Sequence, residues 1–301
     1  MAMITVKNLQ KKYDGTPVVK GIDFQLSPGK CVALLGPNGA GKTTTLRMLS
    51  GLIRSTGGEI HFEGMKGKDI RSQIGYLPQH PVFHNWMTGK EFLVYVGRLA
   101  HLSMTEASAR ADQLLERVGI ADAKNRRIGK YSGGMKQRLG IAQAMIHKPK
   151  LLMLDEPVSA LDPIGRREVL TLMEELKEET TLLFSTHILN DAEEVSDELI
   201  LLHKGEIVES GSMNEVRDRH RVDKIDMRLE AGFEADKQAV AALPSVDHVE
   251  LDKGEWHIYV SDMDQARQQL LQLVQTNNWP VSRFEVGKAT LEDLFMKVVK
   301  E

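Results

Sequence analysis

One short segment near the N-terminus restricts the possible folds of this chain more than any other feature. The apolar run CVALLG, residues 31–36, leads directly into GPNGAGKT, residues 36–43, and then into TTLRML. A short continuous apolar run is typical of a buried parallel strand. The glycine-rich residues that follow allow a tight backbone turn before the next helix. The sequence therefore predicts a strand–loop–helix unit within a parallel α/β sheet.

The loop of this unit fits the pattern G-x-x-x-x-G-K-[ST] at every fixed position, from Gly36 to Thr43. In such a loop the backbone N–H groups point inward at phosphate oxygens, and the helix N-terminus adds its positive end. Lys42 can reach the β- and γ-phosphates, and the Thr43 hydroxyl can bind Mg²⁺. A glycine-rich turn without a ligand is the alternative, which the strand, lysine and hydroxyl together disfavour.

An acidic pair ends a second apolar run, LLMLD, residues 151–155. A buried strand would present Asp155 to the phosphate loop, where it can share a metal ion with Thr43. Glu156 follows immediately, points differently, and can act as general base for an attacking water. A solvated acidic strand end is the alternative, and it is the weaker one beside this loop.

A second helix start, YSGGMKQR, residues 131–138, lies before the acidic pair. Its helix N-terminus could bind anionic oxygens. A flexible turn with Ser132 as helix N-cap explains the same residues, and taken alone this segment favours that interpretation.

The remaining pattern predicts the rest of a first domain, residues 1–221. Two mixed-polarity runs around a DGTP turn, ITVKNLQKKY and VVKGIDFQL, predict an antiparallel start. TTLLFSTH, residues 180–187, reads as a further buried strand, and residues 198–211 read as a hairpin across Lys204-Gly205. Apolar spacings of three and four predict a mainly helical subdomain over about residues 80–147.

The composition changes near residue 222. Residues 222–301 contain 15 acidic and 9 basic side chains, a net charge of −6. Their order of strands and helices, βαββαβ, predicts a small ferredoxin-like domain with a last helix over residues 290–299. This second domain contains no catalytic motif, and a stabilising or dimerising role is our first interpretation of it.

Overall composition excludes several classes of protein. The 301 residues, 42% hydrophobic and 27% charged, fit two globular domains, and the net charge of −3 gives no reason to expect nucleic acid. Cys31 is the single cysteine, which fits a reducing compartment. The start MAMITVKN has no signal-peptide pattern, and no run approaches 18 apolar residues. We therefore expect a cytoplasmic protein whose membrane role needs a separate membrane partner.

Taken together, these motifs resemble those of the ATP-binding cassette (ABC) ATPases over about 220 residues. Residues 36–43 resemble the Walker A loop, and residues 151–156 resemble Walker B with its glutamate. Residues 132–134 resemble the core of the signature motif, residues 159–162 the D-loop. Gln79 in YLPQ resembles the Q-loop glutamine, His187 the switch histidine, and Tyr13 the aromatic that stacks on adenine. The signature departs from the usual LSGGQ, because Tyr131 replaces Leu and Met135 replaces Gln.

The resemblance implies an α/β fold: a P-loop NTPase domain of the ABC type with a mixed sheet core, an antiparallel β subdomain and a helical subdomain. It implies catalytic roles for Glu156, His187 and Gln79. It implies ATP contacts from Tyr13, Gly36, Pro37, Asn38, Gly39, Ala40, Gly41, Lys42, Thr43, Thr44, Ser132, Gly133, Gly134 and Asp162. It implies Mg²⁺ ligands from Thr43, Gln79 and Asp155.

The resemblance also implies a mechanism and partners. Two such domains, in a homodimer or with a paired ATPase subunit, would close head to tail on two ATP molecules and power a transporter through a separate transmembrane permease subunit at the inner face of the membrane. Residues 80–97 occupy the position that receives the permease, with Phe83 and Trp86 as interface candidates and Phe92 and Tyr95 as core. The segment ATLEDLFMKV, residues 289–298, resembles the end of ABC-2-type export ATPases.

Two alternatives belong to other classes. A soluble ABC-type ATPase of DNA repair would carry a long coiled coil, but Gln79 and Ser132 are only 53 positions apart. Translation ATPases of this kind hold two cassettes in one chain, and this chain has one. A non-catalytic nucleotide-binding regulator conflicts with the presence of both Glu156 and His187.

Overall fold

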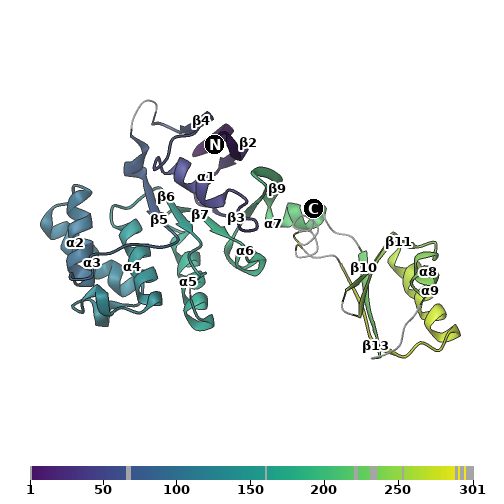
Figure 1. Cartoon of the computed structure of the whole chain (residues 1–301). Coiled ribbons are helices and arrows are strands. Elements are labelled where there is room, and N and C mark those ends of the chain that lie inside the picture. Colours follow the sequence, from purple (N-terminus) through teal and green to yellow (C-terminus); the bar gives the residue numbers. More distant parts are fainter. Residues whose placement is uncertain are drawn as a thin grey trace. The chain divides into compact units, whose positions relative to one another are not determined.

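The computed structural model describes residues 2–65, 69–159, 161–219, 223–230, 236–252, 254–288, 291 and 295. The chain forms two compact units, residues 1–213 and 214–301 (Figure 1). We expected the boundary after residue 221, which is eight residues beyond the observed boundary at residue 213. Helix α7 (Met213–Arg219) occupies the residues between the observed and the expected boundary.

The first unit is built on a six-stranded sheet of order β5-β6-β7-β3-β8-β9. Its strands are β5 (Ile74–Leu77), β6 (Leu151–Asp155), β7 (Thr181–Thr186), β3 (Cys31–Leu35), β8 (Glu198–His203) and β9 (Glu206–Ser212). The first five are parallel, and β9 returns antiparallel through the predicted hairpin. Every residue of β3, β6 and β7 is buried, as the apolar runs predicted.

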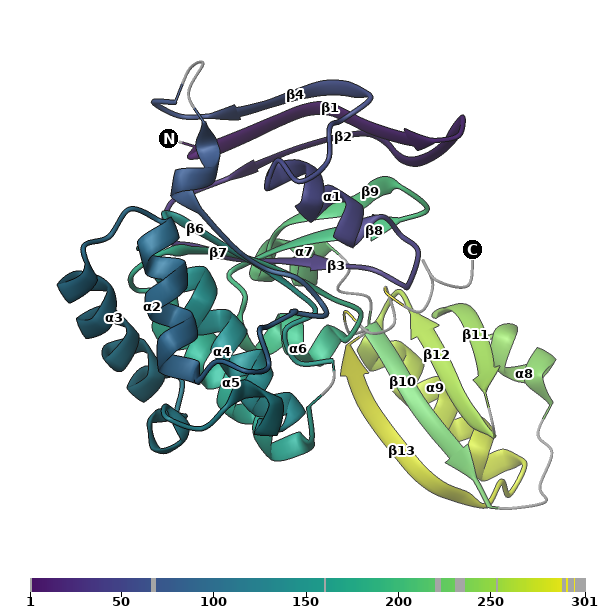
Figure 2. The same ribbon diagram turned by 60° about the vertical axis from the view of Figure 1, so that its left-hand side comes forward.

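A three-stranded antiparallel sheet of order β2-β1-β4 covers part of this unit, and α1 (Lys42–Leu49) lies between the two sheets (Figure 2). Its strands are β1 (Ile4–Tyr13), β2 (Thr16–Leu26) and β4 (Gly57–Phe62). The turn between β1 and β2 consists of Asp14 and Gly15, both with positive φ, which suits a tight hairpin. One apolar core joins the two sheets and α1, with Leu9, Leu26 and Leu46 completely buried in it.

The predicted helical subdomain contains α2 (Gly89–Leu99), α3 (Met104–Arg117) and α4 (Gly133–Met145). Reciprocal capping boxes at Thr88 and Ser103 start α2 and α3. Phe92 is buried as expected, but the prediction that Tyr95 is core was wrong, because its side chain is 44% exposed. The Tyr95 ring instead lies beside the exposed His84 ring, with centroids 6.0 Å apart.

The remaining helices of this unit support the sheet. Helix α5 (Pro163–Leu176) follows β6, and α6 (Leu189–Val195) follows β7. Short 3-10 turns cover Ile70–Gln73, Ala121–Ala123 and Ile128–Lys130.

The second unit has the predicted βαββαβ order: β10 (Asp223–Leu229), α8 (Lys237–Ala241), β11 (Val246–Asp252), β12 (Glu255–Val260), α9 (Met263–Thr276) and β13 (Val281–Lys288). The sheet is antiparallel with order β11-β12-β10-β13, and α8 and α9 lie on the same face of it (Figure 1). This arrangement is a ferredoxin-like sandwich. The last expected helix, residues 290–299, lies outside the described residues except for 291 and 295.

Candidate functional site

The site lies at the carboxyl edge of the six-stranded sheet, where adjacent parallel strands end together. The register pairs Leu35 of β3 with Thr186 of β7, and Asp155 of β6 with Ser185 of β7. The residues that follow three neighbouring strands therefore meet at one edge, the usual place for ligands in such sheets.

The phosphate loop connects β3 to α1, and Lys42 is the first residue of that helix. The preceding Gly41 has φ 105°, which glycine adopts at no steric cost. The Lys42 ammonium is 5% exposed and donates to the carbonyl oxygens of Gly36 at 2.7 Å and Pro37 at 3.1 Å. Burial lowers the pKa of Lys42, while the nearby carboxylates of Glu156 and Asp155 oppose that shift. The loop thus places the Lys42 ammonium at the N-terminus of α1.

The Asp155 carboxylate is completely buried and surrounded by hydroxyl groups. Thr43 Oγ1 donates to Asp155 Oδ1 at 3.0 Å, and Ser185 Oγ donates to the same oxygen at 2.7 Å. The Tyr76 hydroxyl lies 3.5 Å from Asp155 Oδ2. Burial raises the pKa of Tyr76 to about 12, and Asp155 adds to the shift. Tyr76 therefore stays protonated near neutral pH and can donate its hydroxyl hydrogen to Asp155.

The Glu156 carboxylate lies between two nitrogen groups. Its Oε1 is 3.7 Å from Lys42 Nζ, and its Oε2 is 3.2 Å from His187 Nδ1. The Glu156 backbone has φ 49°, a left-handed conformation that costs a non-glycine residue about 1–3 kcal/mol. Its N–H donates to Ser185 Oγ at 2.9 Å. The structure thus joins Lys42, Glu156 and His187 in one contact network.

The signature residues start α4 on a different part of the unit. Ser132 is the N-cap of α4, and its Oγ accepts from Met135 N–H at 3.2 Å. Nothing lies within 4 Å of the position that a Cβ on Gly133 would take, so this helix start is open. Asp162 has the same capping role at α5, accepting from Gly165 N–H at 2.9 Å. Within the described residues, no hydrogen bond or ion pair joins these groups to the phosphate loop.

Two further predicted residues are also separate from the central network. Tyr13 ends β1 and is 45% exposed, with Lys11 Nζ 4.9 Å from its ring centre. Gln79 is half-buried in the bend after β5. Of the D-loop residues, Ala160 lies outside the described residues.

Sequence reasoning missed two members of the site, Ser185 and Tyr76. Both are polar residues within or at the end of apolar strands, and Ser185 precedes His187 by two positions. That placement in LLFSTH was a usable signal, because a polar residue on a buried strand needs a partner. For Tyr76 only the pairing of β5 with β6 reveals the neighbour, Asp155.

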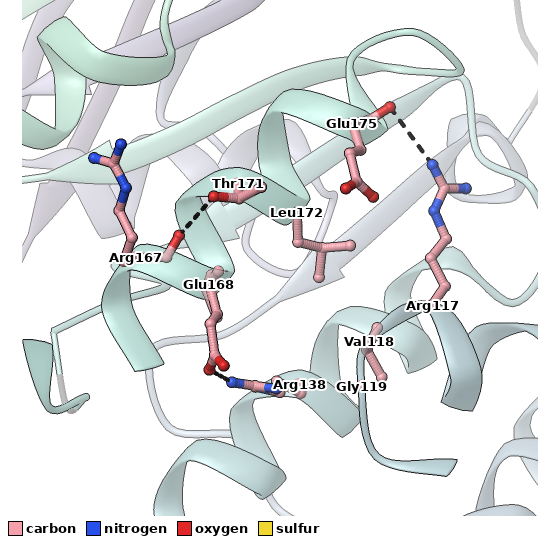
Figure 3. Close-up of a pocket in the computed structure, with 10 residues that line it drawn as sticks. Arg117, Val118, Gly119, Arg138, Arg167, Glu168, Thr171, Leu172 and Glu175 are labelled. Carbon is pink, nitrogen blue, oxygen red and sulfur yellow. Dashed lines mark hydrogen bonds and ion pairs between the residues drawn. The ribbon is translucent and has the colours of Figure 1, made fainter. Parts of the chain in front are cut away.

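A separate cavity of about 260 Å³ lies where α3, α4 and α5 meet (Figure 3). Two arginines of its lining are already paired, because Arg138 forms an ion pair with Glu168 and Arg117 forms one with Glu179 at 2.6 Å. None of the predicted site residues lines it. This cavity therefore gives no support for a second ligand site.

Comparison with known proteins identifies the family. Residues 19–159 match the family described as ABC transporter, and residues 211–299 match the C-terminal domain of DrrA1-3-like ATP-binding proteins. The uncharacterized ABC transporter ATP-binding protein YxlF of Bacillus subtilis is 44% identical over 300 residues, which is 99% of each chain. The chain belongs to the ABC transporter ATP-binding proteins. This confirms three predictions from the sequence: the resemblance to the ABC ATPases, the α/β fold class and the ATPase activity.

Two further relatives inform the function of this ABC protein. The daunorubicin resistance ATP-binding protein DrrA3 of Streptomyces coeruleorubidus is 34% identical, with 97% of this chain and 94% of that one covered. A solved ATP-binding cassette, a dimer in a post-hydrolysis state with ADP and Pi, is 26% identical with TM-score 0.65, covering 70% of this chain and 99% of that one. Among the described residues, no helix has the length and apolarity needed to cross a membrane.

Proposed function

We propose that Glu156 is the general base for ATP hydrolysis in this ABC ATPase. The supporting observation is the network of Lys42, Glu156 and His187 beside the phosphate loop. Residues 36–44 would hold the phosphates through backbone N–H groups, with Lys42 on the β- and γ-phosphates. Glu156 would take the proton of the attacking water, and His187 would contact the γ-phosphate. Tyr13 would stack on adenine.

The residues near Asp155 fit a bound Mg²⁺ ion. The Thr43 hydroxyl and the Asp155 carboxylate are hard oxygen donors 3.0 Å apart, and the Gln79 amide would be a third. When bound, Mg²⁺ neutralises charge on the β- and γ-phosphates. The role of Asp155 and Thr43 is to hold it there, and the buried hydroxyl partners keep Asp155 in one orientation.

The active assembly in this proposal is a head-to-tail pair of ATPase subunits. Ser132–Gly134 and Asp162 form no hydrogen bond or ion pair with the phosphate loop of their own chain among the described residues, and the helix start at Gly133 is open. Each would complete the site of the partner subunit. The dimeric state of the solved relative with ADP and Pi supports this arrangement.

The proposed role is export through a separate transmembrane permease, at the cytoplasmic face of the membrane. Two similarities support this direction: the one to DrrA3, a daunorubicin resistance protein, and the one to a DrrA-type C-terminal domain. Repair or translation is not favoured, since the relatives are transporter proteins. Residues 80–97 offer a docking surface in this proposal, because Val82 and Trp86 within them are exposed apolar side chains.

The test combines Glu156→Gln with Ser132→Arg. Glu156→Gln keeps size but cannot accept the proton, so phosphate release should fall about 10²–10⁴-fold while MgATP still binds. The closed dimer should then accumulate on size-exclusion chromatography with ATP. Adding Ser132→Arg should remove that dimer, since a bulky side chain would occupy the phosphate contact.

Ser103→Arg is the matched control, because Ser103 is also an exposed N-cap that accepts a backbone N–H. It removes an equivalent cap from α3 but should leave the ATP-dependent dimer intact. Near-normal turnover in Glu156→Gln would remove Glu156 from the base role. A dimer that persists with Ser132→Arg would contradict the shared-site arrangement.

A further inference from the structure

We propose that Ser185 is a positioning residue that sets the relative orientation of Asp155 and Glu156. The inference rests on the proposed roles of these two carboxylates. Ser185 belongs to β7, not to the segment that carries either of them, and no motif of the sequence analysis included it.

One hydroxyl makes both contacts. Ser185 Oγ donates its hydrogen to Asp155 Oδ1 at 2.7 Å and accepts the N–H of Glu156 at 2.9 Å. A serine hydroxyl has one donor and two acceptor lone pairs, so these two bonds are compatible and act together. The same atom therefore holds a side chain and the following backbone.

The Glu156 backbone needs such a partner. Its φ of 49° is a left-handed conformation that a non-glycine residue keeps only when its surroundings enforce it. The bond to Ser185 orients the peptide that leads into this conformation. It thereby directs the Glu156 side chain toward Lys42 and His187.

Burial makes the arrangement specific. Ser185 is 0% exposed and lies opposite Asp155 in the β6–β7 register, so water cannot replace its hydroxyl. Loss of the hydroxyl would leave the Glu156 N–H without a partner in the interior, which is an unfavourable state. The backbone would then leave the left-handed conformation, and the carboxylate would turn with it.

The first measurement is amide hydrogen exchange of Glu156 in the nucleotide-free full-length chain, at single-residue resolution. Ser185→Ala should accelerate this exchange roughly tenfold, the effect of losing one buried hydrogen bond. Thr180→Val is the matched control, because Thr180 lies just before the same strand and its buried hydroxyl donates to Pro149 O at 2.8 Å. Thr180→Val should leave exchange at Glu156 unchanged.

The second measurement is kinetic. Ser185→Ala should lower kcat about 10–100-fold, as removal of an outer partner of a site does, with little change in the KM for ATP. In a Glu156→Gln background the same substitution should change kcat by no more than about twofold, because Ser185 acts largely through Glu156. Ser185→Thr, which keeps the hydroxyl, should recover activity that the equally shaped Ser185→Val lacks. The comparison of Ser185→Thr with Ser185→Val also tests the positioning role if Ser185→Ala does not fold.

The outcomes separate this inference from the proposed function. Unchanged Glu156 exchange in Ser185→Ala, or equal activity of the Thr and Val variants, would overturn the positioning role. Equal kcat losses in Ser185→Ala and Thr180→Val would also do so. Near-normal turnover in Glu156→Gln would instead refute the role of Glu156 as base. The hydrogen-exchange result would still decide whether Ser185 orients the Glu156 backbone.

Discussion

The Tyr131 hydroxyl fills the space that a side chain on Gly89 would need. A Cβ on Gly89 would lie 2.3 Å from Tyr131 Oη, and that oxygen donates to Ala123 O at 2.8 Å. Gly89 is the first residue of α2, and Tyr131 directly precedes the signature residue Ser132. The tyrosine that replaces the usual signature leucine thus contacts the start of α2.

The first prediction concerns this contact. Gly89→Ala should lower the free energy of unfolding by about 1–3 kcal/mol, because overpacking forces a shift of buried atoms. Tyr131→Leu in the same chain should recover part of that loss, since the hydroxyl is gone. Urea unfolding of the two single variants and the double variant measures the coupling. Gly133→Ala is the control, since it also starts a helix but its Cβ meets nothing. Equal losses at Gly89 and Gly133 would contradict the contact.

The second prediction concerns Cys31, which is completely buried in β3. Burial raises the pKa of its thiol from 9.0 to about 12, and the charge of Asp197 adds to the shift. The folded state therefore binds the proton more tightly, and this contribution to stability is full below pH 9 and is lost as pH rises from 9 toward 12. At pH 10 the loss is on the order of 1 kcal/mol.

Urea unfolding at pH 8 and pH 10 checks this sign. Cys31→Ala should show a smaller drop in stability between the two pH values than the unchanged protein. The native thiol should also react with a thiol reagent at pH 8 only as fast as the chain unfolds. Rapid reaction in the native state would mean that the thiol is accessible.

The third prediction concerns docking of the permease. Trp86 is 70% exposed, and only the His84 ring lies near it among the described aromatic rings. Trp86→Ala should weaken co-purification with the membrane subunit roughly 30-fold, as a central interface tryptophan does, without lowering the urea midpoint. Leu271→Ala, an exposed apolar residue of α9, should leave co-purification unchanged. A loss of stability with retained binding would show that Trp86 supports the fold instead.

The fourth prediction concerns the division of the chain. Removing residues 222–301 should leave ATP affinity unchanged, because each candidate site residue lies before residue 190 and the second unit has its own apolar core. The cut keeps α7 complete. Binding of a fluorescent ATP analogue to the soluble truncated chain tests this. A folded but non-binding product would contradict the independence of the first domain.

The sequence determined the local chemistry of the site. The spacing of Gly36, Lys42 and Thr43 after an apolar strand predicts a phosphate loop, and the strand and helix start that it requires are present because they are short-range properties. The apolar run before Asp155 and Glu156 likewise predicted a buried strand with acids at its end. The βαββαβ order of the second unit followed from periodicity alone.

Only the tertiary structure decided which side chains meet across strands and helices. Ser185 reaches Asp155 because β6 and β7 pair in one register, and Tyr131 meets Gly89 because the start of α2 and the segment before α4 converge. Tyr95 has the spacing of a core residue, yet its face of α2 is left uncovered. Periodicity states which face of an element is apolar, but register and helix packing depend on the whole fold, so these contacts cannot be derived from local sequence.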